Sequence, residues 1–189
     1  RMRELGGNGP SFDTIVASGP NSSRPHHICS ERVIENGDPV ILDFGCWYEG
    51  YPSDQTKTII AGDQEPSEKF KEVFELVKNA QQKGVESVEP SVQDQSIDDV
   101  VRDVIEEAGY GDEFIHRTGH GVGVEIHECH KIPPKTHETK MKLQPGMVFS
   151  VEPGVYIEGE FGIRIEDLVL VTREGSERLN SSSKEWSLN

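Results

Sequence analysis

The first third of the chain has short apolar runs that end in turns, a pattern typical of β-strands. One run covers residues 12–17, a second covers residues 39–45, and a third covers residues 56–60. The sequence Asn-Gly-Asp at residues 36–38 predicts a turn just before the second run. We expect the second and third runs to fold back on one another as a hairpin.

Two segments in the middle of the chain repeat their apolar residues at the spacing of an amphipathic helix. Pro66 predicts the first turn of the first helix, which is expected to end near Gly84. Ser96 and Asp99 resemble a capping box at the start of the second helix, which is expected to end at Gly109. The apolar positions that define the two helix faces are Phe70, Val73, Phe74, Val77, Ile97, Val100, Val101, Val104, Ile105 and Ala108.

From residue 116 onward the pattern is again that of strands, with apolar runs at residues 147–151 and 163–171. There is no internal repeat, and 189 residues suit one domain covering residues 1–189. The opening residues 1–5, followed by two glycines, resemble the last turn of a helix. This unusual start predicts that the chain is a fragment of a longer protein.

Composition narrows the function classes. With 34 acidic and 19 basic side chains, the net charge of -15 disfavours nucleic acid and anionic membranes as partners and is compatible with cations. No apolar run is long enough to span a membrane, and no export leader is visible, so a soluble protein is expected. Cys29, Cys46 and Cys129 include no CxxC pair, which argues against a disulfide framework or a thiolate zinc site and favours the cytoplasm.

Asp43 lies inside an apolar run, where an unpaired carboxylate costs several kcal/mol unless a cation compensates it. A buried aspartate that caps the turn through Gly45 explains the same pattern equally well. Asp54 follows eleven positions later, and a hairpin between the two would bring the carboxylates together. Close like charges favour a shared metal ion.

Glu152 and Glu166 repeat this pattern of an acid within a strand-like apolar segment. His116, His120 and His127 lie within twelve positions, and glycines flank the middle one. A lone histidine is more often a hydrogen-bonded core residue, but this cluster favours a functional role.

Four carboxylates and one imidazole, without a thiolate, suit manganese, cobalt, iron or zinc. The four negative charges would balance two divalent cations, and paired metals activate water for hydrolysis. The sequence therefore predicts a two-metal site with the ligands Asp43, Asp54, His120, Glu152 and Glu166.

Two other motifs are not supported. The run from His127 to Lys131 lacks the second histidine of HExxH, so a zincin helix is not predicted. The glycines at 119, 121 and 123 lack the GxGxxG spacing and the following helix of a dinucleotide site.

The acidic and histidine motifs together resemble the pita-bread metallopeptidase family, which includes methionine aminopeptidases, Xaa-Pro aminopeptidases, prolidases and creatinase. The resemblance runs from about Gly9 to Gly175 and fills all five metal-ligand positions in the family's order. Its matching segments are residues 40–45, 53–56, 118–123, 151–154 and 164–167.

Within that family, His116, the run 124–128 and Arg164 resemble the Xaa-Pro branch. The resemblance implies an α/β (α+β) pita-bread fold, with an antiparallel sheet backed by helices, and two divalent metal ions, most commonly manganese. It also implies removal of an N-terminal residue that precedes proline, from a dipeptide or a longer peptide, by attack of a metal-bridging hydroxide.

By the same matching, His26 takes the place of a substrate-facing histidine, although His27 is one position away. His116 and His127 would orient the substrate, and Glu152 would both bind metal and move a proton. Arg164 either serves the catalytic site or pairs with a neighbouring acid on the sheet.

The family's further N-terminal helices and the N-terminal domain of its Xaa-Pro members have no counterpart here, which predicts N-terminal truncation. The resemblance is also compatible with a homodimer of the full-length protein. The alternative functions are a methionine aminopeptidase, a creatinase-like hydrolase, or a peptide-binding or protein-binding module without metals.

Overall fold

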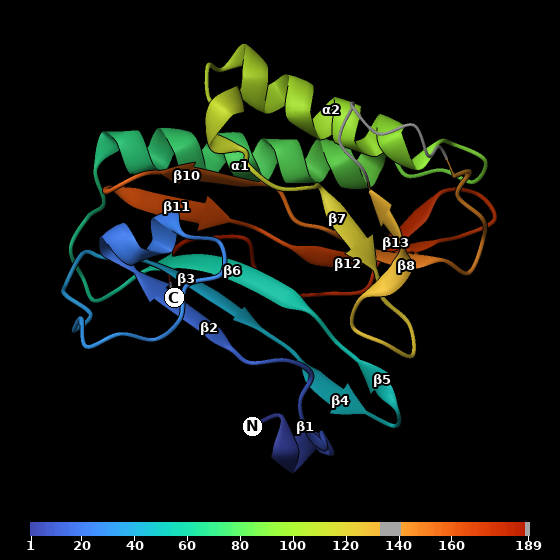
Figure 1. Ribbon diagram of the computed structural model, residues 1–189, viewed down its shortest axis with the longest axis horizontal. Helices are drawn as coiled ribbons and strands as arrows, with labels where there is room; N and C mark the ends of the chain where they lie inside the picture. Colours follow the sequence, from blue (N-terminus) through green and yellow to red (C-terminus); the bar gives the residue numbers. More distant parts are fainter. Residues whose placement is uncertain (133–140, 188–189) are drawn as a thin grey trace.

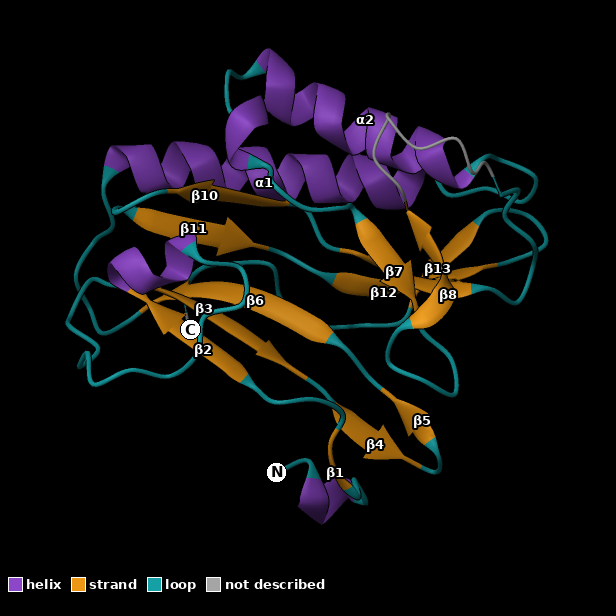
Figure 2. Cartoon of the chain, in the orientation of Figure 1, coloured by secondary structure: helices purple, strands orange, loops and turns teal. Residues whose placement is uncertain are grey.

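The computed structural model describes residues 1–132 and 141–187 of the chain. Two long helices, α1 and α2, lie together over a layer of short strands (Figure 1; Figure 2). The helices are α1 Glu68–Glu86 and α2 Asp94–Glu107, with 3-10 turns η1 Arg3–Leu5, η2 Gly19–Ser23 and η3 Gly111–Glu113. The strands are β1 Gly9–Pro10, β2 Ile15–Ser18, β3 Pro39–Phe44, β4 Cys46–Tyr48, β5 Tyr51–Pro52, β6 Gln55–Ile60, β7 Gly119–Gly121, β8 Glu128–Ile132, β9 Val148–Val151, β10 Gly154–Ile157, β11 Phe161–Arg164, β12 Asp167–Val171 and β13 Ser176–Arg178.

The strands form antiparallel sheets of order β2-β3-β6, β13-β12-β9-β7-β8, β10-β11 and β1-β4-β5. The expected antiparallel sheet structure backed by helices is therefore confirmed. Neither α1 nor α2, within the part of the chain that is described, has the length and apolarity needed to cross a membrane.

The expected hairpin is formed by β3 and β6, which pair from Pro39 with Ile60 to Phe44 with Gln55. The short strands β4 and β5 follow β3 and precede β6 in the sequence, and they extend the hairpin at its far end. At the base of this extension, a Cβ on Gly45 would lie 1.8 Å from the carbonyl oxygen of Ser53. Only glycine allows the two chain segments to approach so closely, which keeps the ends of β3 and β6 together.

The apolar run at residues 163–171 is strand-like, as expected, but it is divided between two strands. β11 ends at Arg164 and pairs with β10, whereas β12 begins at Asp167 and pairs with β9. The backbone changes partners at Glu166, whose N–H donates to the carbonyl of Thr56 in β6 (3.2 Å). The apolar pattern continues across the break because both strands are buried.

A matching break separates β9 from β10 at Glu152 and Pro153. The N–H of Ile165 donates to the carbonyl of Pro153 (3.3 Å), so the two breaks lie side by side. Since β9 pairs with β12 and β10 pairs with β11, Glu152 and Glu166 lie at the same level along the paired strands.

The predicted helix boundaries need correction at three points. Ser67, rather than a helical Pro66, caps α1 by accepting a hydrogen bond from the N–H of Phe70 (3.1 Å). α1 also continues through Gly84, because this glycine is a packing contact: a Cβ there would lie 2.6 Å from Val101. α1 and α2 can therefore pack closely at this position.

The predicted capping box of the second helix is also wrong. α2 begins at Asp94, before Ser96, and the Ser96 hydroxyl donates back to the carbonyl of Gln93 (2.6 Å). The side chain of Asp94 accepts hydrogen bonds from the N–H groups of Gln95 and Met141 instead. The end of the helix agrees with the prediction, because Gly109 follows it in the left-handed conformation (φ 86°).

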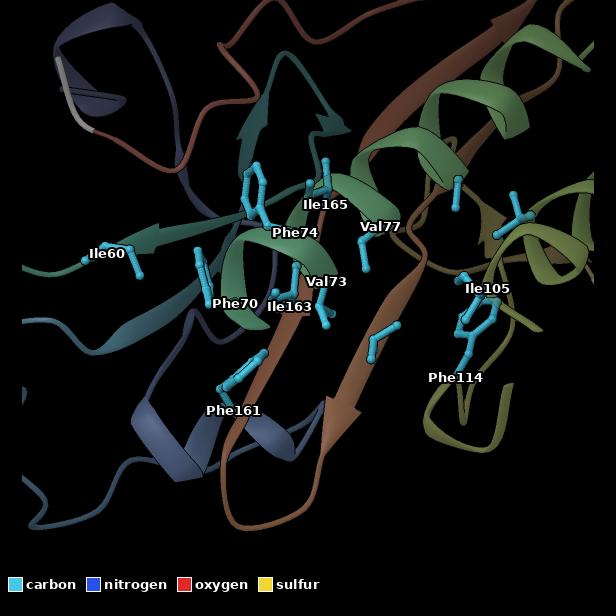
Figure 3. Packing of buried hydrophobic residues seen from close by; sticks show 13 residues of the cluster. Ile60, Phe70, Val73, Phe74, Val77, Ile105, Phe114, Phe161, Ile163 and Ile165 are labelled. Atoms are coloured by element: carbon cyan, nitrogen blue, oxygen red, sulfur yellow. The ribbon is translucent and has the colours of Figure 1, made fainter. Parts of the chain in front are cut away.

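The main core lies between the helices and the β10–β11 hairpin (Figure 3). All four expected apolar residues of α1 are buried, and they face Phe161 and Ile163 from β11. On α2 the expected face is only partly correct, since Ala108 is exposed. Full burial of one large apolar side chain contributes about 1.5–3 kcal/mol, so this core fixes the hairpin against the helices.

Candidate metal and substrate site

The five predicted metal ligands lie around one cavity of about 910 Å³. β3 carries Asp43, the residue just before β6 is Asp54, and β7 carries His120. Glu152 and Glu166 enter from the two neighbouring strand breaks. Residues separated by more than 100 positions therefore meet in one place.

Asp54, His120 and Glu166 form the tightest group, with one ligand atom from each lying within 4.8 Å of the others. Nε2 of His120 lies 3.6 Å from Oδ2 of Asp54 and 3.5 Å from Oε1 of Glu152. Asp54 and Glu166 are only 5% and 2% exposed. This arrangement of buried oxygen atoms and one imidazole nitrogen suits a divalent cation.

Burial and mutual repulsion raise the pKa values of these carboxyl groups. Burial, together with the neighbouring charges of Asp43 and Glu152, raises the pKa of Asp54 to about 8. Burial raises the pKa of Glu152 to about 7, although Arg164 opposes this change. The pKa of Glu166 is raised well above its usual value, again mainly by burial. Such crowding of acids in a dry site is relieved when cations bind.

One carboxylate oxygen of Asp43 accepts a hydrogen bond, and the other has no hydrogen-bond partner among the described residues. Its Oδ2 accepts a hydrogen bond from Arg164 (2.7 Å), and in the described part of the chain its buried Oδ1 has no hydrogen-bond partner. A buried acceptor without a partner is rare and calls for an explanation. A cation bound in the cavity would be the partner of this oxygen and would explain its position. The alternative, that Asp43 caps the turn at Gly45, has no hydrogen bond among the described residues to support it.

Four carboxylates and one imidazole therefore fit the two divalent ions that the sequence predicts, in charge and in ligand type. The match rests on the crowded buried acids and the unsatisfied oxygen of Asp43.

Arg164 is the central hydrogen-bond donor beneath the site, with a side chain that is 3% exposed. Its Nε donates to the hydroxyl of Thr56 (3.2 Å), which donates to Oε2 of Glu166 (2.5 Å). Its Nη1 donates to the hydroxyl of Tyr156 (2.9 Å). Arg164 does pair with a neighbouring acid, but that acid is Asp43, a predicted ligand, and Arg164 also lines the cavity, so both sequence interpretations of Arg164 stay predictions.

Sequence reasoning missed Thr56 and Tyr156. A signal for Thr56 exists, because side chains two positions apart share one face of a strand and Thr56 therefore lies on the face of Asp54. Tyr156 has no comparable signal. Its role depends on strand β10 lying opposite the loop that contains His116.

The three histidines expected to contact substrate also line the cavity. His26 follows η2 and is among the lining residues, whereas His27 is not. Nε2 of His116 lies 2.8 Å from the hydroxyl of Tyr156, and burial lowers the pKa of His116 to about 4. The ring of His127 lies 4.3 Å from that of His120, centroid to centroid.

The cavity also has an apolar wall that the sequence did not predict as part of the site. It includes the side chains of Phe12, Ile15, Phe114 and Ile115, which come from two distant segments. The cavity therefore combines a polar floor that can hold metal with apolar surface that can hold a small, partly apolar ligand.

The model of the metallopeptidase family M24 matches residues 1–173, most of the chain. The chain belongs to this family. Its sequence is 45% identical to the Xaa-Pro dipeptidase of Pyrococcus horikoshii over 184 residues, which is 97% of this chain and 51% of the relative.

Comparison with solved structures supports the same family. The prolidase from Pyrococcus horikoshii superimposes with a TM-score of 0.92 at 44% identity, over 98% of this chain and 52% of that one. The Xaa-Pro dipeptidase from Bacillus anthracis gives 0.91 at 48% identity, over 97% of this chain and 50% of that one. The pita-bread fold is thereby confirmed. The chain spans about half the length of the relatives it matches.

Proposed function

We propose that this chain binds two divalent metal ions through Asp43, Asp54, His120, Glu152 and Glu166, and that it is the catalytic domain, residues 1–189, of an Xaa-Pro peptidase. The observation that carries the proposal is the convergence of the five side chains on one cavity, where Asp54, His120 and Glu166 already lie within 4.8 Å of one another. Manganese is the proposed metal, with cobalt, iron and zinc as the other candidates for this ligand set.

The proposed substrate is a short peptide whose second residue is proline. Relatives with 44–48% identity are named Xaa-Pro dipeptidase or prolidase, which supports this choice and favours a dipeptide. The apolar wall of the cavity offers a surface for the proline ring, and the histidines at its rim offer hydrogen bonds to the peptide.

The proposed chemistry is hydrolysis of the bond before proline. Bound metal ions lower the pKa of water and polarise the scissile carbonyl. Glu152 would move a proton from the attacking water to the leaving nitrogen, because its carboxyl group lies in the cavity beside His120. His26 and His127 bind the peptide, and His116 presents a neutral ring next to Tyr156. Arg164 keeps Asp43 and Glu166 in place.

Two further parts of the proposal come from the sequence. A cytoplasmic location is consistent with the free thiols of Cys29 and Cys46 in the described residues. A homodimer is proposed for the full-length protein.

Calorimetric titration with Mn²⁺ tests the metal site. The chelator-treated chain is expected to bind two ions. Asp54→Asn is expected to weaken binding by more than about 10-fold, since it replaces a buried charged ligand with a neutral side chain of the same size. The control is Asp112→Asn, which changes an exposed acid and is expected to bind like the wild type. Absence of Mn²⁺ binding to the wild-type chain would contradict the metal proposal.

Peptide assays on the Mn²⁺-loaded chain test the substrate. An Xaa-Pro dipeptide is expected to be hydrolysed faster than the matching Xaa-Ala dipeptide, an Xaa-Pro tripeptide, a methionyl peptide or creatine. Equal or greater turnover of the Xaa-Pro tripeptide would indicate an Xaa-Pro aminopeptidase rather than a dipeptidase. Equal or greater turnover of the methionyl peptide or of creatine would favour another activity. Binding of proline peptides without metal or turnover would indicate a binding module instead.

A further inference from the structure

Asp98 and Arg102 form a buried ion pair on α2, outside the predicted ligand set. Nε of Arg102 donates to Oδ2 of Asp98 (2.8 Å), and Nη2 donates to Oδ1 (3.0 Å). The side chain of Asp98 is completely buried, and that of Arg102 is 12% exposed. The two residues are one helical turn apart, so α2 itself holds the pair together.

Within the described residues, the remaining side-chain hydrogen bonds of this pair go to the segment at residues 114–118. Arg102 donates to the carbonyl of Phe114 through Nη1 and to the carbonyl of His116 through Nη2, both at 3.0 Å. The hydroxyl of Thr118 donates to Oδ1 of Asp98 (2.7 Å). The guanidinium also lies over the ring of Phe114, 4.2 Å from its centroid.

Residues 114–118 belong to no helix or strand. Backbone carbonyls in such a segment need other partners, and here a charged fork supplies two of them. These contacts hold the backbone on both sides of the His116 side chain. The ring of His116 can then reach the hydroxyl of Tyr156 at 2.8 Å.

A buried ion pair is weak evidence for a role in stability, because a well-packed apolar pair often serves stability equally well. An apolar pair could not bind the two carbonyls, however. The fork of arginine matches two acceptors at a fixed separation, which a lysine ammonium cannot reproduce. The geometry therefore indicates control of position rather than general stabilisation.

We propose that Asp98 and Arg102 are positioning residues that set the place of the His116 ring in the substrate cavity. The importance of this ring for catalysis rests on the proposed peptidase function. The placement of the ring does not depend on that function, so the positioning role and the peptidase function can be tested separately.

The test uses Arg102→Lys, which keeps the positive charge and loses the fork. The matched control is Arg32→Lys, because Arg32 forms an equally close two-point pair with Asp38 on a different element. The first readout is the nuclear magnetic resonance spectrum of the metal-free chain with ¹⁵N-labelled histidine. The His116 ring signals are assigned by their loss in His116→Gln.

In Arg102→Lys the His116 ring signals are expected to shift, and the pKa of the ring is expected to rise from about 4 toward its ordinary value as the ring becomes more exposed to water. Arg32→Lys is expected to leave both unchanged. The second readout is turnover of an Xaa-Pro dipeptide by the Mn²⁺-loaded chain. There kcat/KM is expected to fall about 10- to 100-fold in Arg102→Lys, because a misplacement of about 1 Å in a substrate-positioning group can cost about 100-fold in rate. Mn²⁺ stoichiometry should stay the same, since all five ligands are intact.

Thr118→Val provides a second variant in case Arg102→Lys does not fold. It removes one attachment point at nearly constant volume and leaves the ion pair in place, so a smaller shift of the same His116 signals is expected. Unchanged His116 ring signals in every folded variant would overturn the proposal. A wild-type chain without turnover would instead refute the proposed function, and the ring signals would still decide the positioning role.

Discussion

Arg164 donates a 2.7 Å hydrogen bond to Asp43, which joins β11 to β3 across 121 residues of sequence. The side chain of Arg164 is buried, at 3% exposure, and that of Asp43 is mostly buried, at 14%. Arg164 is also fixed to β6, because its N–H donates to the hydroxyl of Thr58 (3.0 Å), which in turn donates to the Arg164 carbonyl (2.9 Å). One residue thus connects β3, which carries Asp43, with β6 and β11, next to which Asp54 and Glu166 lie.

Arg164→Met tests this connection. The variant keeps most of the side-chain volume but leaves the buried carboxylate of Asp43 without its partner, so the free energy of unfolding of the metal-free chain is expected to fall by about 3–5 kcal/mol. Urea unfolding measures this loss. Arg173→Met, which changes an exposed arginine, is the control and is expected to stay within about 0.5 kcal/mol of wild type. Equal stability of the two variants would show that Asp43 does not depend on Arg164.

Gly119→Ala tests how β7 is placed against its neighbour. A Cβ at this position would lie 1.8 Å from the carbonyl oxygen of Ser150, so β7 must move away from β9 and take His120 with it. Calorimetry is expected to show Mn²⁺ binding weakened by at least about 10-fold. At Gly111 a new Cβ would mainly meet the flexible side chain of Glu106, so Gly111→Ala is expected to bind normally. Normal binding by Gly119→Ala would mean that the position of His120 is not critical.

The pKa of His116 predicts how stability depends on pH. Burial lowers this pKa to about 4 in the folded chain, against 6.5 for the free side chain. Between these values the unfolded chain binds more protons, so the contribution of His116 is complete above about pH 6.5 and is lost as the pH falls toward 4.

Urea unfolding of wild type and His116→Gln at several pH values measures this effect. The carboxyl groups are common to both proteins, so their contributions largely cancel in the comparison. The stability of wild type relative to the variant is expected to drop by about 1.4 kcal/mol per pH unit across the window. A constant difference between pH 6.5 and 4 would contradict the lowered pKa.

Lys184 anchors the segment after β13 to the completely buried carboxylate of Asp167, which also accepts a hydrogen bond from Gln81 and pairs with Arg178. Lys184→Met is expected to lower the free energy of unfolding by about 2 kcal/mol, because one charged hydrogen bond is lost while the other partners remain. Thermal or urea unfolding measures this loss of stability. Lys83→Met, on the exposed face of α1, should change stability by less than about 0.5 kcal/mol. A similar small effect for both would rule out an anchoring role.

Periodicity predicted both helices, whose burial is one-sided, and short apolar runs between turns predicted the β3–β6 hairpin. Periodicity did not divide residues 163–171, since a run buried along its whole length carries no period to mark the break at Glu166. The helix starts were also misplaced, because Ser67 and Gln93 occupy the cap positions and capping depends on local backbone geometry. Gly84 resembled a helix end but is a contact between helices.

The order of residues along the chain was enough to reveal two chemical features: isolated acids within apolar segments and a histidine cluster among glycines. Those features identified all five proposed ligands, because charged groups in apolar runs are costly unless they have a partner. The side chains that support these residues became visible in the folded chain. The contacts of Arg164 with Asp43 and Tyr156, and of Arg102 with the backbone of residues 114 and 116, join segments that no local pattern relates. Such contacts depend on where whole strands and helices pack, and packing is a property of the complete fold.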